Sequence, residues 1–438
     1  MKMNKISKAL IVAILAIAFC LQFACSSVGG LKTGDAEYAG KATPSGLNKP
    51  DSTGETAPDD ASGEGESKDS ATAGQLTAGA HNDNEYYGDW LKLFEDAITE
   101  PDSQEQAKTP AKFNKYKQSD FKLFSLFRVK VTVRNGELPV EGATVTCSDD
   151  KDETLYSAVT DANGTAYLFP KKSGGIITAK HSGKTITTDY SYENNDLTLE
   201  LGNAEADKQK LIQLMFVIDA TGSMGDEMSY LKAELGDVIR RVVEKNDNDV
   251  KVQLALLFYR DDGDSEKFAY SDFADVTQPE KYATMQKILA KQSANGGGDY
   301  EEALDEAMQL AVSKQWSDNS TKLIFNLLDA PCHGNERNAL VYSTAVYEAA
   351  KKGIRICPIL ASGADLFTEY LTRQAAILTG GTFTFITDDS GIGGSHLDPE
   401  LPNVTVELLN DMLVRLIDGY YTGKFAAPVY WKDAVKAK

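Results

Sequence analysis

Between residues 208 and 424, short and almost continuously apolar runs alternate with longer segments of helical periodicity. Two of the apolar runs are LIQLMFVI, which begins at Leu211, and TKLIFNLL, which begins at Thr321. Strands with this pattern are buried on both faces, as parallel strands covered by helices are. The alternation therefore predicts a doubly wound, Rossmann-like α/β domain over residues 208–424. In such domains, ligands bind beyond the carboxyl ends of the strands.

Polar residues collect at that edge of the predicted sheet. The first strand ends at Asp219, and Thr221 and Ser223 follow it. The second strand rises, a hairpin-paired third strand descends, and the next helix climbs, which brings Asp299 in the loop ANGGGDYEE to the same edge. The strand TKLIFNLL also rises, and it delivers Asp329 beside Asp219. Strand direction alone therefore predicts that these five side chains meet.

All five side chains offer oxygen, and none offers sulfur or imidazole nitrogen, so the set suits a hard divalent cation. Mixed carboxylate and hydroxyl ligands favour Mg²⁺, with Ca²⁺ and Mn²⁺ as alternatives. Two of the five are neutral hydroxyls, and Mg²⁺ keeps water where the protein supplies too few ligands. We therefore expect an under-neutralised ion whose water exchanges for an acidic side chain of a protein partner.

Asp219 has two other interpretations, a helix cap and a catalytic nucleophile. Phosphatases that form an aspartyl-phosphate also place an aspartate at the end of a hydrophobic strand, but they need a second aspartate where this chain has Thr221. Ser223 lacks the glycine, two residues earlier, that a nucleophile elbow requires. We therefore expect a binding module and no enzymatic activity. A passive envelope scaffold and a phosphatase-like enzyme are the alternatives.

The segment DATGSM resembles the metal-ion-dependent adhesion site of the von Willebrand factor A family, whose pattern is Asp-x-Ser/Thr-x-Ser. The first three candidate ligands fill this pattern, and Asp329 in LLDAPCHG fills the place of the later aspartate of the family. The family's intervening threonine falls on Gly298, and the resemblance implies that Asp299 substitutes for it. It further implies a metal-dependent module that binds proteins. In some members the last helix slides on binding, so we expect residues Val404 to Tyr421 to respond to occupancy.

The first residues have the pattern of an export signal. A lysine-containing start precedes an apolar run over residues 9–19, which is short for a membrane span. The run ends in FACSS, where Cys25 resembles the lipidated cysteine of bacterial lipoproteins; Gln22 replaces the usual leucine, so Cys20 and ordinary cleavage are alternatives. We expect residues 1–25 to be a lipoprotein signal peptide. Cys25 would then be lipid-anchored in the bacterial cell envelope, at the periplasmic or surface face of the outer membrane.

The next two segments are predicted to connect this anchor to the folded part of the chain. Residues 26–84 are mainly Gly, Ser, Thr, Ala, Asp and Glu, which predicts a disordered linker because little apolar surface can be buried. In the helical linker segment, residues 85–125, four apolar residues recur at helical spacing: Trp90, Leu91, Phe94 and Ile98. They predict a short helix that packs on a neighbouring domain. Residues 425–438 are expected to form a C-terminal tail.

Residues 126–202 have the period of two that is typical of β-strands. Short alternating runs such as FRVKVTV are bounded by turn sequences such as RNGE and DANG. Six or seven strands of this kind predict a small all-β, immunoglobulin-like sandwich. The segment VRNGELPVEGATVTCSDD resembles the carboxypeptidase-regulatory-like family, and this resemblance implies a spacer or interaction module.

The remaining features exclude some functions and leave others open. The net charge of −20 argues against nucleic acid as a partner, because phosphates would be repelled. An odd number of cysteines after Cys25 does not indicate a disulfide framework. The acidic segment YRDDGDSE is predicted to be a solvated hairpin, and residues 300–302 are predicted to begin a helix. His333 and His396 match no zinc spacing and are expected to order loops.

Overall fold

The computed structural model describes residues 71–95, 97–98, 108–109, 111–202, 210–225, 227–245, 250–399 and 401–437. These residues all belong to one compact unit, Lys68–Lys438. The predicted signal peptide, Cys25 and residues 26–70 of the predicted linker lie outside the described residues. Among the described helices, none combines the length and the apolar character needed to cross a membrane.

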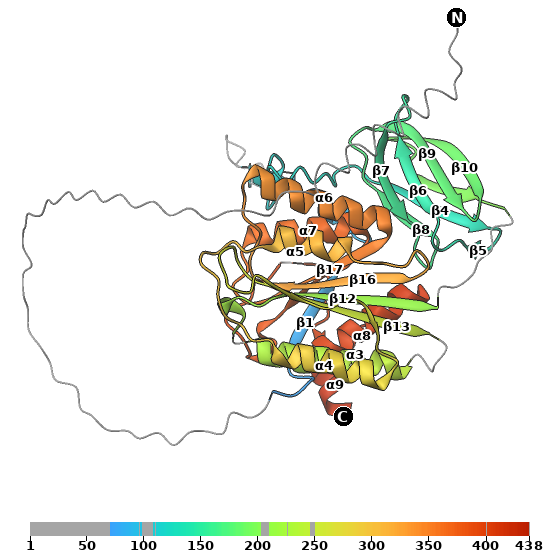
Figure 1. Ribbon diagram of the computed structural model, residues 1–438. Helices are drawn as coiled ribbons and strands as arrows, with labels where there is room; N and C mark the ends of the chain where they lie inside the picture. Colours follow the sequence, from blue (N-terminus) through green and yellow to red (C-terminus); the bar gives the residue numbers. More distant parts are fainter. Residues whose placement is uncertain are drawn as a thin grey trace, which may run out of the picture. The chain divides into compact units, whose positions relative to one another are not determined.

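A nine-stranded mixed sheet forms the centre of the α/β domain, with the strand order β14-β13-β12-β16-β17-β18-β1-β19 and β15 paired with β13 (Figure 1). The neighbouring strands from β13 to β18 are parallel, whereas β14, β15 and β1 run antiparallel to their partners. The bounds are β1 Thr77–His81, β12 Leu211–Asp219, β13 Lys251–Tyr259, β14 Phe268–Tyr270, β15 Ala274–Asp275, β16 Thr321–Leu328, β17 Ile354–Leu360, β18 Phe383–Ile386 and β19 Glu407–Leu408.

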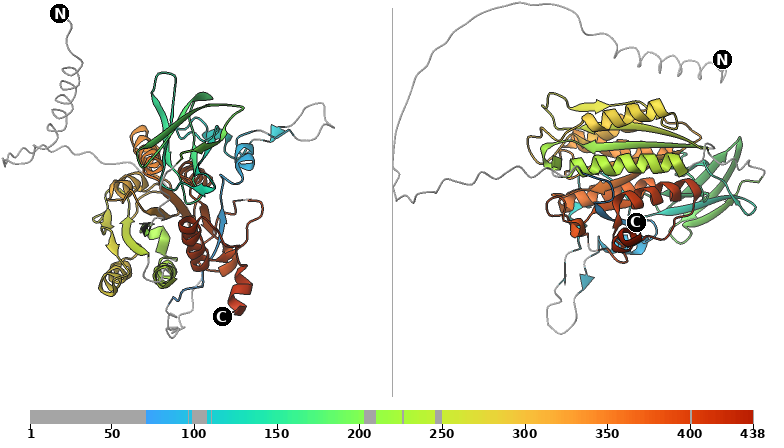
Figure 2. Two further views of the ribbon diagram at one scale, coloured as in Figure 1. Left: turned by 90° about the vertical axis from the view of Figure 1, so that its right-hand side faces the viewer. Right: turned by 90° about the horizontal axis from the view of Figure 1, so that it is seen from below.

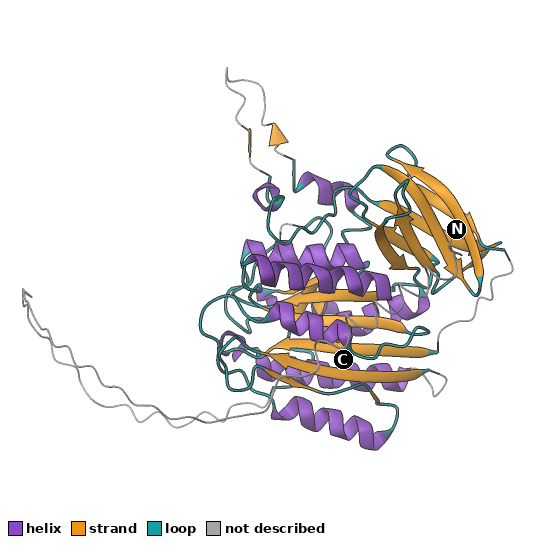
Figure 3. Ribbon diagram, turned by 45° about the horizontal axis from the view of Figure 1, so that its top comes forward, coloured by secondary structure: helices purple, strands orange, loops and turns teal. Residues whose placement is uncertain are grey.

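Helices cover both faces of this sheet, as Figures 1 and 3 show. One face carries α5, α6 and α7, and the other carries α3, α4 and α8, which lie side by side in the right-hand view of Figure 2. The bounds are α3 Met228–Lys245, α4 Pro279–Lys291, α5 Leu304–Ser313, α6 Glu336–Lys352, α7 Leu366–Thr379 and α8 Leu409–Thr422. Helices cover both faces because both faces are apolar. In strand β12, Met215 and Val217 belong to one hydrophobic core, and Leu214 and Phe216 belong to the other. The predicted doubly wound α/β fold is confirmed.

Strand β1 corrects the predicted linker. Residues 77–81 lie inside the α/β sheet, where Ala78 pairs with Ile386 of β18 on one side and with Glu407 of β19 on the other. The prediction of disorder over residues 26–84 is therefore wrong for this strand. The segment TAGAH has too little apolar surface to stand out in the sequence, but small residues fit here, because a Cβ at Gly79 would lie 2.5 Å from the ring of Phe385.

Glu234 of α3 fixes the residues that lead into β1. Its carboxylate accepts hydrogen bonds of 2.8 to 3.0 Å from the backbone N–H groups of Gly74, Gln75 and Leu76. Glu234 itself is fully buried. The chain therefore enters the α/β domain directly, before the β-rich domain begins.

The β-rich domain is inserted between β1 and β12 rather than placed before the α/β domain. It contains two four-stranded sheets, β10-β9-β6-β7 and β11-β4-β5 with β8 paired to β4. The bounds are β4 Val129–Asn135, β5 Leu138–Pro139, β6 Thr144–Ser148, β7 Thr154–Val159, β8 Thr165–Leu168, β9 Gly174–His181, β10 Lys184–Ser191 and β11 Asp196–Glu200. Alternate residues of β4 are buried, as the period of two predicts. We refer to residues 129–200 as the two-sheet domain.

The linker segment packs on the α/β domain, although its helix is shorter than its periodicity suggests. Helix α2 spans Tyr87–Lys92, and Ile98 lies instead in the two-residue strand β2, Ala97–Ile98, which pairs with β3, Lys108–Thr109. Trp90 is fully buried, and the ring of Phe94 lies 6.3 Å from that of Tyr370 on α7. The segment also includes the 3-10 turn η1, Asn114–Tyr116, and the C-terminal tail forms a helix, α9 Trp431–Ala437.

Candidate functional site

Asp219 and Asp329 meet at one edge of the α/β sheet. Strands β12 and β16 are parallel neighbours, with Ile218 of β12 paired with Leu327 of β16, so both strands end at the same level. Asp219 is the last residue of β12, and Asp329 directly follows β16. Both side chains are buried, at 0% and 3% exposure. The predicted convergence of these two aspartates is therefore present in the fold.

The loop after β12 brings two hydroxyl groups to Asp219. Asp219 Oδ1 accepts hydrogen bonds from the backbone N–H of Thr221 at 2.9 Å and from its Oγ1 at 2.6 Å. Thr221 Oγ1 lies 3.2 Å from Ser223 Oγ, within the 3-10 turn η2, Gly222–Gly225. Thr221 is buried and Ser223 is exposed. A carboxylate and two hydroxyls therefore form a continuous line from the interior to the surface.

The charge of Asp219 is poorly compensated. Burial, followed by the charge of Asp329, raises the pKa of Asp219 to about 7, even though Thr221 donates hydrogen bonds to it. The Tyr259 hydroxyl also lowers the pKa of Asp219, and no lysine or arginine of the described chain forms an ion pair with Asp219. Buried carboxylates this close together stay charged only if a cation compensates them.

Glu302 also belongs to this group, although its sequence context does not indicate it. The sequence predicts that residues 300–302 begin a helix, but α5 begins at Leu304, and Glu302 pairs with Cys332 in a parallel β-bridge. Glu302 is 3% exposed, and its Oε1 lies beside the glycine loop, residues 296–298. A Cβ at Gly297 would lie 3.2 Å from this Oε1 and, separately, 3.4 Å from Thr221 Cβ.

The electrostatic environment of Glu302 resembles that of Asp219. Burial, followed by the charges of Asp219, Asp261 and Asp329, raises the pKa of Glu302 to about 9. Its Oε2 has no hydrogen-bond partner among the described residues. In the sequence, YEEAL looks like an ordinary acidic helix start, and only the path of the loop turns Glu302 inward. We call Asp219, Thr221, Ser223, Glu302 and Asp329 the Asp219 site.

Asp299 lies in a second group of side chains at this edge of the sheet. It is exposed and lies with Asp261 and His333, and the ligand atoms of these three residues all lie within 4.8 Å of one another. The charge that acts on Asp219 comes from Asp329. The sequence places Asp299 only one residue from the threonine position of the family, and the backbone path of the glycine loop carries its side chain to the other group.

The predicted solvated hairpin YRDDGDSE is partly buried. Asp261 is only 6% exposed, so the prediction is wrong at this residue, whereas Asp262 is exposed and pairs with Lys267. His333 Nε2 lies 2.9 Å from Asp261 Oδ1. Asp261 is shielded from solvent because the glycine loop and His333 cover one side of the hairpin.

The other histidine on these loops acts as predicted. His396 lies between Glu227 and Asp388, with Nε2 2.7 Å from Glu227 Oε1 and Nδ1 2.7 Å from Asp388 Oδ1. Glu227 immediately precedes α3 and also accepts a hydrogen bond from the backbone of Ser362. His396 therefore joins the loop after β18 to the start of α3, which is a loop-ordering role.

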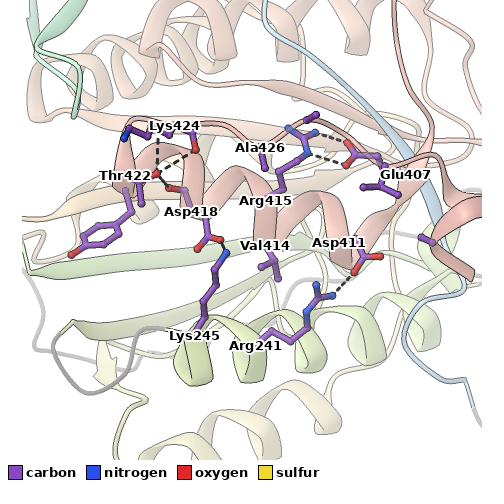
Figure 4. A pocket seen from close by; sticks show the side chains of 14 residues that line it. Arg241, Lys245, Glu407, Asp411, Val414, Arg415, Asp418, Thr422, Lys424 and Ala426 are labelled. Atoms are coloured by element: carbon purple, nitrogen blue, oxygen red, sulfur yellow. Dashed lines mark hydrogen bonds and ion pairs between the residues drawn. The ribbon is translucent and has the colours of Figure 1, made fainter. Parts of the chain in front are cut away.

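A cavity of about 710 Å³ lies elsewhere, between α3, α8 and the C-terminal segment (Figure 4). Its charged side chains pair with one another: Arg241 with Asp411, Lys245 with Asp418, and Arg415 with Glu407. None of its lining residues comes from the loops that carry the Asp219 site. These pairings leave the charges of the cavity largely satisfied, so it is a weaker candidate than the Asp219 site.

Comparisons with known proteins identify the α/β domain. Residues 213–377 match the family model of the von Willebrand factor A domain. The alpha-protein kinase vwkA of Dictyostelium discoideum is 26% identical over 133 residues, which are 30% of this chain and 20% of that protein. This chain therefore spans a small part of the length of that relative.

Two solved structures show a weaker similarity. The pilus adhesin SpaC of Lactobacillus rhamnosus GG in its open conformation has a TM-score of 0.33 at 9% identity, over 67% of this chain and 35% of that chain. A point mutant of the PilB minor pilin of Streptococcus sanguinis has a TM-score of 0.31 at 9% identity, over 67% of this chain and 92% of that chain. The family match, the strand order and the DATGSM loop agree: residues 213–377 of this chain form a von Willebrand factor A domain.

Proposed function

We propose that the Asp219 site holds a divalent cation, Mg²⁺ or alternatively Ca²⁺ or Mn²⁺, and that the α/β domain binds a protein partner through it. The observation that carries the proposal is the grouping of buried acids at one sheet edge, beside two hydroxyls, without a lysine or arginine paired to Asp219 or Glu302 among the described residues. The donors are carboxylate and hydroxyl oxygens, which fit a hard cation.

The residues of the Asp219 site contribute two kinds of ligand. Asp219, Asp329 and Glu302 supply negative charge from the interior, and Thr221 and Ser223 supply neutral oxygens towards the surface. The three carboxylates carry a formal charge of −3, the same as Asp219, Asp299 and Asp329 of the predicted set, so a divalent ion would be neutralised rather than under-neutralised. A partner's acidic side chain would approach the ion from the side of Ser223, which is exposed. Bound metal would supply Lewis-acid attraction for that carboxylate.

The envelope assignment forms the second part of the proposal. Lipid attachment at Cys25 would hold the protein to a bacterial envelope membrane, with the linker leading into β1 of the α/β domain. The two-sheet domain would then be a lateral interaction module, because it is inserted after β1 and does not stand between the anchor and the α/β domain. The resemblance of its sequence to carboxypeptidase-regulatory-like modules supports this role.

Calorimetric titration of the metal-stripped full chain with MgCl₂ tests the cation site. We expect uptake by the wild type and none by Asp219→Asn. Asp150→Asn is the matched control, because it removes the same charge from an exposed turn of the two-sheet domain. Equal uptake by wild type and Asp219→Asn would overturn the proposed site.

A pulldown from envelope fractions tests the binding function. We expect a partner that is captured by the wild type in Mg²⁺ and lost both in chelator and with Asp219→Ala. If the partner is captured equally well in chelator and by Asp219→Ala, a passive scaffold is favoured.

A phosphatase assay of wild type and Asp219→Asn tests the enzyme alternative. Turnover that is lost only in the variant would establish catalysis.

A further inference from the structure

Asp261, Asp299 and His333 come together from three different loops. Asp261 lies in the loop after β13, Asp299 lies in the glycine loop before α5, and His333 lies in the loop after β16. Each offers one ligand atom, and these atoms lie within 4.8 Å of one another. We call these three residues the His333 site.

Backbone contacts hold Asp261 and the glycine loop together. Asp264 Oδ2 accepts hydrogen bonds from the backbone N–H of Asp261 at 3.1 Å and from that of Gly297 at 3.0 Å. The approach is close, because a Cβ at Gly296 would lie 2.5 Å from the Asp264 carboxylate, and Gly296 has a φ of +80°. The loop that carries Asp299 is therefore tied to the loop that carries Asp261.

The nearby cations are already engaged elsewhere. Arg260 donates to the backbone carbonyls of Ser293, Asn295 and Glu266, and Lys267 pairs with the carboxylates of Asp262 and Glu306. Within the described ranges, no lysine or arginine forms an ion pair with Asp261 or Asp299. The basic group that does contact Asp261 is the imidazole of His333, at 2.9 Å.

A separate observation points to a ligand between these loops. Glu302 is 3% exposed, its Oε2 has no hydrogen-bond partner in the described chain, and the charges of Asp261 and Asp264 act on it together with those of the Asp219 site. A buried carboxylate without a partner is costly unless a positive charge lies near it. The arrangement therefore favours a positive charge on the Asp261 side as well as on the Asp219 side.

We propose that Asp261, Asp299 and His333 bind a second divalent cation, of the borderline class that accepts imidazole nitrogen together with carboxylate oxygen, represented by Zn²⁺ and Co²⁺. This ligand set differs from the Asp219 site, which has only oxygen donors and suits Mg²⁺. Three protein ligands leave a coordination position for water. The bound ion would join the three loops that border the Asp219 site.

Metal uptake by the full chain tests this proposal. Metal-stripped protein is titrated with CoCl₂, and the visible absorption of the Co²⁺ ion is recorded. We expect the wild type to show the strong d–d absorption of Co²⁺ bound at low coordination number, His333→Gln to lose it, and Asp219→Asn to keep it. His181→Gln, in β9 of the two-sheet domain, is the matched control and should behave like the wild type.

Metal counting after dialysis against ZnCl₂ gives a second readout. We expect the wild type to bind Zn²⁺ more than about 10-fold more tightly than His333→Gln or Asp299→Asn. Because Asp299 is exposed, Asp299→Asn should fold normally, which its melting curve verifies. If His333→Gln and Asp299→Asn both keep the Co²⁺ spectrum and the Zn²⁺ affinity of the wild type, the proposal is wrong. Failure of the Mg²⁺ test alone would overturn only the Asp219 site.

Discussion

The Asp219 site and the His333 site lie at the same edge of one sheet, yet they balance their charges in different ways. In the Asp219 site the acids are buried, and the pKa values of Asp219 and Glu302 are raised to about 7 and about 9. In the His333 site, burial lowers the pKa of His333, but the hydrogen bond to Asp261 and the charges of Asp261 and Asp299 outweigh it and raise the pKa. The difference teaches that His333 supplies a positive charge to its own site from within the chain, whereas Asp219 and Glu302 take up protons unless a cation is bound.

The largest expected effect follows from removing the central carboxylate of the Asp219 site. Asp219→Asn should weaken Mg²⁺ binding by more than about 100-fold, because a direct ligand matters more than its supporting neighbours, whose loss weakens binding by about 10- to 100-fold. Zn²⁺ uptake at the His333 site should be unchanged. Calorimetric titration with each metal measures both, and equal losses for the two metals would show that the sites are not independent.

The pH dependence of stability should also separate the two sites. The folded-state pKa values of Asp219 and Glu302 lie above their ordinary values of 3.8 and 4.5. Between about pH 5 and pH 9, the folded state therefore holds more protons than the unfolded state, and the free energy of unfolding falls as pH rises, by at most about 1.4 kcal/mol per pH unit for each group.

Urea unfolding of metal-stripped protein at several pH values measures this slope. The double variant Asp219→Asn, Glu302→Gln should flatten it, and Asp299→Asn should not. A wild-type stability that rises steadily from pH 5 to pH 9 would contradict the description of the buried acids.

Removing Glu302 should have opposite effects with and without metal. In metal-stripped protein at pH 9, Glu302→Gln should raise the free energy of unfolding by about 1 to 2 kcal/mol, because a buried carboxylate that faces other acids is replaced by a neutral amide. When Mg²⁺ is added, the free energy of unfolding should increase less for Glu302→Gln than for the wild type. Thermal melts with and without Mg²⁺ give the comparison. If Glu302→Gln lowers the melting temperature equally in both conditions, Glu302 contributes only to packing.

The smallest effect is expected at the exposed ligand. Asp299→Asn should leave Mg²⁺ affinity within about 2-fold of the wild type and reduce Zn²⁺ affinity by more than about 10-fold. This result would assign Asp299 to the His333 site. A loss of Mg²⁺ affinity with intact Zn²⁺ affinity would instead return Asp299 to the Asp219 site, in the place that the family pattern suggested.

The parts of the fold that followed from the sequence depend on buried strands. The continuous apolar runs of β12 and β16 predict parallel, fully covered strands, and their direction alone puts Asp219 and Asp329 at one edge. Strand β1 could not be predicted in this way, because its stability comes from backbone pairing on both sides and from small residues that fit beside Phe385. Glu302 and Asp299 could not be assigned either, since the path of one glycine loop decides which of them turns inward.

The insertion of the two-sheet domain has a similar explanation. Its strands are clear in the sequence because residues such as Val129, Val131 and Val133 alternate with polar residues and are buried. Its position in the chain order suggested a separate domain before the α/β domain. The correction comes from β1, which belongs to the α/β sheet and precedes the two-sheet domain.

The most direct test of the central claim is a crystal structure of the full chain soaked with MnCl₂, with an anomalous map recorded at the manganese edge. We expect a peak in contact with the Thr221 and Ser223 hydroxyls, on the side where Asp219 and Glu302 converge. A map with no peak there, at a Mn²⁺ concentration that saturates ordinary hard-cation sites, would contradict the account of the Asp219 site.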